Sequence, residues 1–351
     1  MNRWIFAIFC ATVFGTPLTA DVFLDRQTTV EGLLPLGKVT IRSQVYIHGD
    51  QKREESVTTL SGLLGFASEP QKNLVLTDLE KGVQYRIHLD EKTYSVDSLR
   101  TLAEMWNAQA EQLSQDTLST IPDSSTVILL KSTWSVRGPL EKQTLHGYET
   151  EHYVIEWVSV WADTVEQETL QHTFTLDLWN SEDPGLAQAL KEEADYQSRL
   201  LEAMGIDVPE ALRTLSGIPS ALLFLQTQFP SDAQQDLEKQ LSRIKGETVR
   251  MVLTAKTVVL GPKPEEEETP EQEPESSGSP FGGLFGKIQK KVQEQFQKPV
   301  EEELERRVEE RLRGPLIEIQ SEILKAQTEP LDPKLFEIPE GFQEVPSGLQ
   351  R

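Results

Sequence analysis

Apolar and polar residues alternate with a period of two through much of the first 260 positions of this chain. Val39, Ile41, Val45 and Ile47 fall on one parity, with mainly polar residues between them. Such alternation is typical of β-strands that bury one face. The same pattern predicts a hairpin over 83–89 and 93–96, and further strands at 126–136, 142–148, 151–162, 166–179, 218–229 and 247–260.

Helices are predicted in the gaps between these strands. Asp97 and Ser98 can cap a helix that runs to about Leu113. Asp183 and Pro184 stand where an N-cap and a first helical residue belong, and the helix that they begin ends at Gly205, with two shorter helices at 210–215 and 231–244. Antiparallel strands with a few helices between them predict an α+β fold with one large curved antiparallel sheet.

The strand at 151–162 is apolar on both of its faces. Tyr153, Ile155, Trp157 and Trp161 share one parity, and the other parity carries Val154, Val158, Val160 and Ala162. A strand of this kind lies between two layers. On a curved sheet one layer could be an apolar cavity, whose wall suits large aromatic side chains; in the alternative, the aromatic residues pack directly against a helix. Tyr153, Ile155, Trp157 and Trp161 are therefore our candidate ligand-binding residues.

The composition changes abruptly at Gly261. Residues 261–280 are rich in Pro and Glu and lack an apolar anchor, which predicts a disordered acidic linker. The sequence over 281–326 is helical in composition, and turn-rich ordered sequence returns near 329. We therefore predict a sheet domain over 21–260 that 329–351 completes, with the linker and a helical insertion or arm over 281–328 between its two parts.

The first part of this insertion combines apolar and basic residues along one predicted helix. Such a helix could lie on an anionic membrane surface, enter a groove on a partner protein, or fold back on its own domain. The candidate residues for membrane or partner contact are Phe281, Leu284, Phe285, Lys287, Ile288, Lys290 and Lys291.

The N-terminus has the anatomy of a secretory signal peptide. Arg3 precedes a short apolar run, and a small residue follows at Ala20, so we expect residues 1–20 to be removed after Ala20. Cys10, the single cysteine, lies within this segment. These features predict a soluble periplasmic or secreted protein without disulfides. The formal net charge of −23 opposes binding to nucleic acid.

Motifs for catalysis or metal binding are missing from the sequence. None of the five histidines forms an HxxxH or HxH pair, and we expect all of them at ordinary exposed strand positions: His48, His88, His146, His152 and His172. There is no GxSxG nucleophile elbow and no glycine-rich phosphate loop. We therefore predict no catalytic residue, no metal site and no cofactor.

Several longer stretches resemble a known group of proteins. "LTDLEKGVQYRIHLDEKTYSV", "LDLWNSEDPGL", "LSGIP", "ETVRMVLTAKTVV" and "LDPKLFEIPEGF" follow one another as they do in an uncharacterised group of secreted bacterial proteins. Proteins of that group resemble the lipoprotein carriers LolA and LolB in their fold. Over 21–260 and 329–345, the resemblance implies a half-closed antiparallel barrel, partly lidded by helices, with a concave interior that can hold an acyl chain. It transfers no functional residue.

The leading prediction is a noncatalytic periplasmic protein that binds a hydrophobic or lipid-like ligand in its concave sheet, in envelope lipid or lipoprotein handling. The alternative is a protein interaction module that acts through its helical arm, with an envelope protein or a membrane surface as partner. A hydrolase is a distant third. Deleting residues 261–328 should distinguish the first two, because a carrier would keep its ligand whereas the module would lose its partner.

Overall fold

The structure is a computed structural model that describes residues 21–34, 37–62, 69–105, 107–108, 127–163, 168–206, 241, 243–261 and 317–347. Four predicted features lie outside the described residues. They are the signal peptide, the acidic linker after Gly261, the strand at 218–229 and the candidate contact residues between Phe281 and Lys291. Among the described helices, none is long and apolar enough to cross a membrane.

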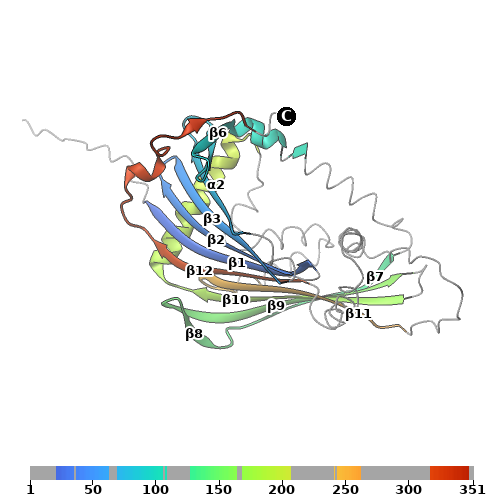
Figure 1. Cartoon of the computed structure of the whole chain (residues 1–351). Helices are drawn as coiled ribbons and strands as arrows, with labels where there is room; N and C mark the ends of the chain where they lie inside the picture. The colour runs from blue at the N-terminus through green and yellow to red at the C-terminus, as the bar shows by residue number, and fades with distance from the viewer. Residues whose placement is uncertain are drawn as a thin grey trace, which may run out of the picture.

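All the described strands belong to one sheet. Its order is β13-β6-β5-β4-β3-β2-β1-β12-β11-β10-β9-β7, and β8 lies beside β9. Figure 1 shows this sheet as an open, curved surface that bends from β6 to β7. The strands are β1 (Val22–Leu34), β2 (Gly37–His48), β3 (Gln51–Gly62), β4 (Gln71–Asp78), β5 (Val83–His88), β6 (Thr93–Ser98), β7 (Val127–Arg137), β8 (Lys142–Leu145), β9 (Tyr148–Asp163), β10 (Glu168–Ser181), β11 (Glu247–Val259), β12 (Ile317–Gln327) and β13 (Gln343–Glu344).

The pairing is antiparallel throughout, apart from the parallel pair of β13 and β6. The strands from β1 to β6 follow one another as a meander, in the region where the period-two pattern predicts strands. Register shifts interrupt the ladders between Asp25 and Arg26 of β1 and between Trp179 and Asn180 of β10. Because bulges bend a strand and increase its twist, these two positions contribute to the curvature of the sheet.

The strand β12 contradicts the prediction of a helix up to residue 326. It lies between β1 and β11, where Ser321 is opposite Thr28 on one side and Met251 on the other. The sequence of β12 is rich in Glu, Gln and Lys, which favour a helix in isolation, but pairing with a strand on each side overrides that weak preference. The helical insertion therefore cannot extend over 317–327, and the deletion of 261–328 would remove a central strand.

The helix α2 (Pro184–Ala203) packs on one face of the sheet, which we call the helix face. The N-cap is Asp183, whose carboxylate accepts a hydrogen bond from the Leu186 N–H, and Pro184 follows it as predicted. Gly205 follows the C-cap with a positive φ of 73°, a conformation that favours glycine. Buried residues of α2 pack on β1, β2, β11 and β12 in one cluster: Leu186, Ala189, Leu190 and Tyr196 with Val22, Leu24, Val45, Ile47, Val249 and Ile323.

Two further segments cover the end of the sheet near β6. Residues 99–105 are helical, and the hydroxyl of Ser98 accepts a hydrogen bond from the Thr101 N–H at 3.0 Å, which confirms the predicted cap. On the opposite face of the sheet, the C-terminal segment packs Ile338 and Phe342 against Leu74, Leu76 and Ile87. The larger part of the helix face, toward β7, lies away from both segments.

Candidate ligand-binding face

Three aromatic rings form a continuous strip across β7, β9 and β10 on the helix face. Trp134 is directly opposite Trp157, and Trp157 is directly opposite Phe174. Each neighbouring pair is stacked, with ring centroids 5.5 Å apart for Trp134 and Trp157 and 5.1 Å apart for Trp157 and Phe174. Stacked pairs of this kind contribute about 0.5–1.5 kcal/mol beyond area burial. We call Trp134, Trp157 and Phe174 the aromatic band.

The helix face continues as an apolar surface next to the aromatic band. One row of directly opposed residues crosses five adjacent strands: Val136, Ile155, Leu176, Leu253 and Ile319. A second row holds Tyr153, Leu178 and Met251. These rows form a hydrophobic cluster against which Leu241 and Ile244 pack, and none of its described members belongs to α2. The apolar surface of the sheet thus extends well beyond the part that α2 covers.

The four residues predicted to bind a ligand all fall on the helix face. Tyr153, Ile155 and Trp157 are buried, whereas Trp161 is half-buried near the end of β9. On the other side of the strand Val154 is buried, but Val158 and Val160 are only half-buried. The pattern within the strand places these four residues on one face, and the structure has them there. The pattern could not identify Trp134 and Phe174 as stacking partners, because that depends on the register between separate strands.

A row of polar side chains crosses the same face beside the aromatic band. Ser132, Ser159, His172 and Thr257 occupy directly opposed positions on β7, β9, β10 and β11, and we call them the polar row. The Trp157 Nε1–H donates to Ser132 Oγ at 2.9 Å, and the Trp161 Nε1–H donates to Ser159 Oγ at 3.0 Å. His172 Nδ1 lies 2.8 Å from Thr257 Oγ1.

The polar row is buried at its centre and more accessible at its two ends. Ser159 is 0% exposed and His172 is 7% exposed, whereas Ser132 and Thr257 are half-buried. Burial lowers the pKa of the His172 imidazole below its ordinary value of 6.5, so the ring is neutral at pH 7. The prediction that His172 occupies an ordinary exposed position is therefore wrong. The alternation in the strand, which places it with Leu170 and Phe174, was the signal for burial.

A second polar cluster lies on the opposite face, where the turn between β8 and β9 meets β12. The Glu322 carboxylate accepts hydrogen bonds from Arg250 Nε at 2.5 Å and Gln320 Nε2 at 2.6 Å, and it lies 3.0 Å from His146 Nε2. Burial alone would raise the pKa of the Glu322 carboxyl, but these partners hold that pKa below its ordinary value of 4.5. The cluster therefore attaches the turn to the central strands.

His152 takes a different partner from His146, although the two residues flank the same turn. His152 Nε2 lies 2.8 Å from Asp177 Oδ1, and its ring stacks on Trp179 with centroids 4.5 Å apart. The guanidinium of Arg250 lies over the other ring of this stack, 5.5 Å from the centroid of Trp179. Within the described part of the chain, no three His, Cys, Asp or Glu side chains come together as ligands for a metal ion.

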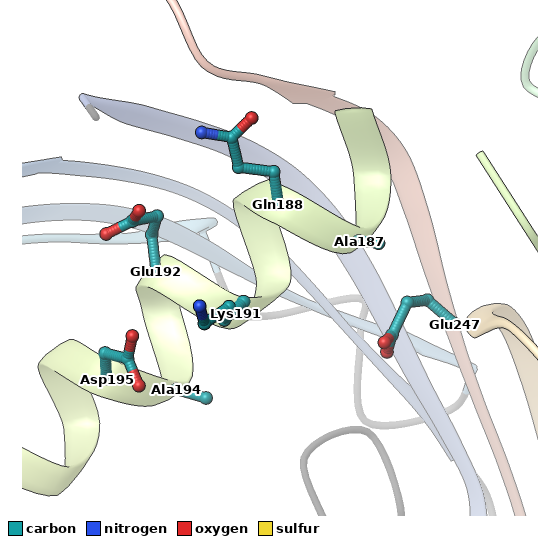
Figure 2. A pocket seen from close by; sticks show the side chains of 7 residues that line it. All are labelled: Ala187, Gln188, Lys191, Glu192, Ala194, Asp195 and Glu247. Atoms are coloured by element: carbon teal, nitrogen blue, oxygen red, sulfur yellow. The ribbon is translucent and has the colours of Figure 1, made fainter. Parts of the chain in front are cut away.

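A polar cavity of about 560 Å³ lies beside α2. Figure 2 shows Gln188, Lys191, Glu192 and Asp195 extending from α2, with Glu247 on the other side. Ala187 and Ala194 complete the lining. Its charged lining differs from the apolar pocket that the sequence predicts, and none of the four predicted ligand-binding residues contributes to it.

Replacing Glu247 by Gln should stabilise the protein at pH 7. Burial raises the pKa of the Glu247 carboxyl above 4.5, so folding favours its protonated form and this contribution to stability is lost as the pH rises through the raised pKa. The neutral amide avoids that loss. We expect a gain of at most about 1 kcal/mol in the free energy of unfolding, because the group is partly solvated.

Urea unfolding at several pH values measures this effect. The gain should disappear below pH 4.5, where the carboxyl is protonated in both states. The matched variant Glu192→Gln, on the α2 wall of the same cavity, should change the free energy of unfolding by less than about 0.5 kcal/mol. A Glu247→Gln protein that is less stable than wild type at pH 7 would contradict the expectation.

No protein-family model matches this chain, and no curated protein is significantly similar to it in sequence.

Proposed function

We propose that this protein binds a hydrophobic or lipid-like ligand on the helix face of its curved sheet and does not transform it. One observation carries the proposal: an apolar surface crosses five adjacent strands beyond the cluster of α2 and ends in the stacked aromatic band. Large, rigid aromatic and aliphatic side chains on a concave surface are typical of sites for apolar ligands. The open, curved antiparallel sheet is compatible with the half-closed barrel of the LolA and LolB carriers.

The proposed setting is the bacterial envelope, where a carrier shields acyl chains from water. An acyl chain that moves from water to an apolar surface gains about 0.8 kcal/mol for each CH₂ group that it buries. The apolar face of the sheet crosses five strands, and neighbouring strands are about 4.8 Å apart. The proposal requires no catalytic residue, because binding and release of an acyl chain break no covalent bond.

Substitutions in the aromatic residues of β9 test this function. We expect Trp157→Leu and Trp161→Ala each to weaken the binding of the methyl ester of dansyl-labelled undecanoic acid by about tenfold, which corresponds to about 1.4 kcal/mol of lost contact. Fluorescence titration of the full-length protein measures the change. Trp179→Leu is the matched control, because Trp179 lies on the opposite face, where it stacks on His152.

Circular dichroism should show that all three variants remain folded under the conditions of the titration. Loss of binding in the two β9 variants, with normal binding by Trp179→Leu, supports a ligand on the helix face. Unchanged binding in Trp157→Leu and Trp161→Ala, or an equal loss in all three variants, would show that the probe binds elsewhere.

A further inference from the structure

The polar row interrupts an otherwise apolar part of the helix face. On one side of it lies the aromatic band, and on the other side a row of apolar residues is paired strand by strand: Leu129, Trp161, Leu170 and Val259. Polar side chains that are buried between apolar rows reduce stability unless their hydrogen bonds are satisfied. Two of the four, Ser159 and His172, are buried, and all four lie in register on adjacent strands with hydrogen-bond partners, an arrangement that an ordinary apolar core does not need.

The hydrogen bonds of this row leave hydroxyl protons that can be donated. Ser132 and Ser159 each accept a bond from an indole N–H, and a serine hydroxyl that accepts one bond can still donate its own proton. Ser132 is half-buried and belongs to β7, the last strand at this end of the described sheet. A ligand that approaches from the β7 side meets Ser132 as the first hydrogen-bond donor next to the aromatic band.

The positive charges of these strands all lie on the opposite face. The strands β7, β9, β10 and β11 contain four lysine and arginine residues in all. Each of the four is directly opposite a residue whose side chain is on the other face from the polar row. The pairs are Lys131 with Val160, Arg137 with Val154, Arg250 with Trp179, and Lys256 with Thr173. These strands therefore direct no lysine or arginine toward the helix face. An ionised carboxylate or phosphate buried there would have no cation beside it, and several kcal/mol of lost hydration would be uncompensated.

We propose that the polar row selects acyl ligands whose polar group is uncharged, such as an ester carbonyl or a hydroxyl. The Ser132 hydroxyl donates to this group at the β7 end of the row, and the acyl chain lies along the aromatic band. This inference rests on the proposed function, because it assigns a class of ligand to the same face. It goes further in excluding free fatty acids and phosphate-bearing head groups as preferred ligands at neutral pH.

Two probes with the same acyl chain, one ionised and one a neutral methyl ester, test this selectivity. Dansyl-labelled undecanoic acid is ionised at pH 7.5, since carboxyl groups of this type titrate near pH 4 to 5, whereas its methyl ester is neutral. We expect the full-length protein to bind the ester at least about tenfold more tightly than the acid. Ser132→Ala should reduce this preference to about threefold, because the ester loses its hydrogen-bond donor whereas the ionised carboxylate, which stays in water, loses none. The part of the preference that comes from the missing cation remains.

The ratio of the two affinities is the readout that separates selectivity from structural damage. A variant that only loosens the aromatic band weakens both probes equally and leaves the ratio unchanged. Ser135→Ala is the matched control, because Ser135 lies on the same strand but is paired with Glu156 of the opposite face. It should retain the full preference for the ester.

The outcomes of this experiment test the proposed function and the role of the polar row separately. Tight binding of the ester with a ratio that Ser132→Ala reduces supports both. Binding of both probes with equal affinity, or tighter binding of the acid, overturns the role of the polar row and leaves the proposed function intact. If neither probe binds, the proposed function fails first, and the selectivity has no basis.

Discussion

A proline at position 321 should destabilise this protein by about 3 kcal/mol or more. Ser321 is opposite Met251 of β11 and Thr28 of β1, so β12 is paired on both sides at this point. Proline removes the backbone N–H, and its ring does not fit the interior of a sheet. Because β12 connects the two halves of the sheet, we expect the midpoint of urea unfolding to fall sharply.

The matched control at this position is Ser321→Thr. Threonine keeps the hydroxyl group, which lies 3.3 Å from Thr28 Oγ1, and it favours strand conformation. We expect it to change the free energy of unfolding by less than about 0.5 kcal/mol. If both variants are as stable as wild type, β12 is not a central strand and the order of the sheet is wrong. Deletion of 317–327 should have a larger effect of the same kind and abolish cooperative unfolding.

Replacing Glu322 by Ala should reduce the free energy of unfolding by about 3 kcal/mol at pH 7. Glu322 is 7% exposed, and its removal leaves Arg250, Gln320 and His146 without their shared acceptor. Removing one member of a buried, hydrogen-bonded charge cluster typically has effects of this size, since the remaining charge is left uncompensated. Glu318→Ala, on the same strand and the same face, should change stability by less than about 0.5 kcal/mol.

The same variant should alter how stability depends on pH. The folded-state pKa of the Glu322 carboxyl is lowered, so its contribution is complete above its ordinary pKa of 4.5 and is lost as the pH falls through the lowered value. Wild type should therefore lose more stability than Glu322→Ala below pH 4.5. Parallel acid unfolding curves for the two proteins would show that the carboxyl is not held in its charged form by these partners.

Much of the fold follows from patterns that each stretch carries on its own. The strand at 151–162 and the helix that begins after Asp183 are both present, because alternation over a long strand and an Asp-Pro helix start are local signals. The local sequence of β12 instead predicts a helix. Its alternation is clear only at Ile317 and Ile319 before Ser321 interrupts it, and the partners that stabilise the strand are distant in the sequence.

The residues of the candidate site could likewise be predicted only where a single strand carries the signal. The parity of Tyr153, Ile155, Trp157 and Trp161 follows from a single strand, and all four lie on one face. The polar row depends instead on three registers at once, since four strands must pair correctly, and His172 is opposite Ser159 only if β9 and β10 pair without a slip. A change of register by one residue would reverse the faces of a strand, so sequence patterns alone could not bring these residues together.

The pairing of β1 with β12 has a consequence for how the chain is made. Arg26 is opposite Ile323, which lies far later in the chain, so one edge of β1 has its partner only after the intervening residues have been synthesised. Contacts between such distant segments form slowly, and an unpaired strand edge is a template for aggregation. We therefore expect the nascent β1–β6 meander to expose the unpaired edge of β1 until β12 has been synthesised.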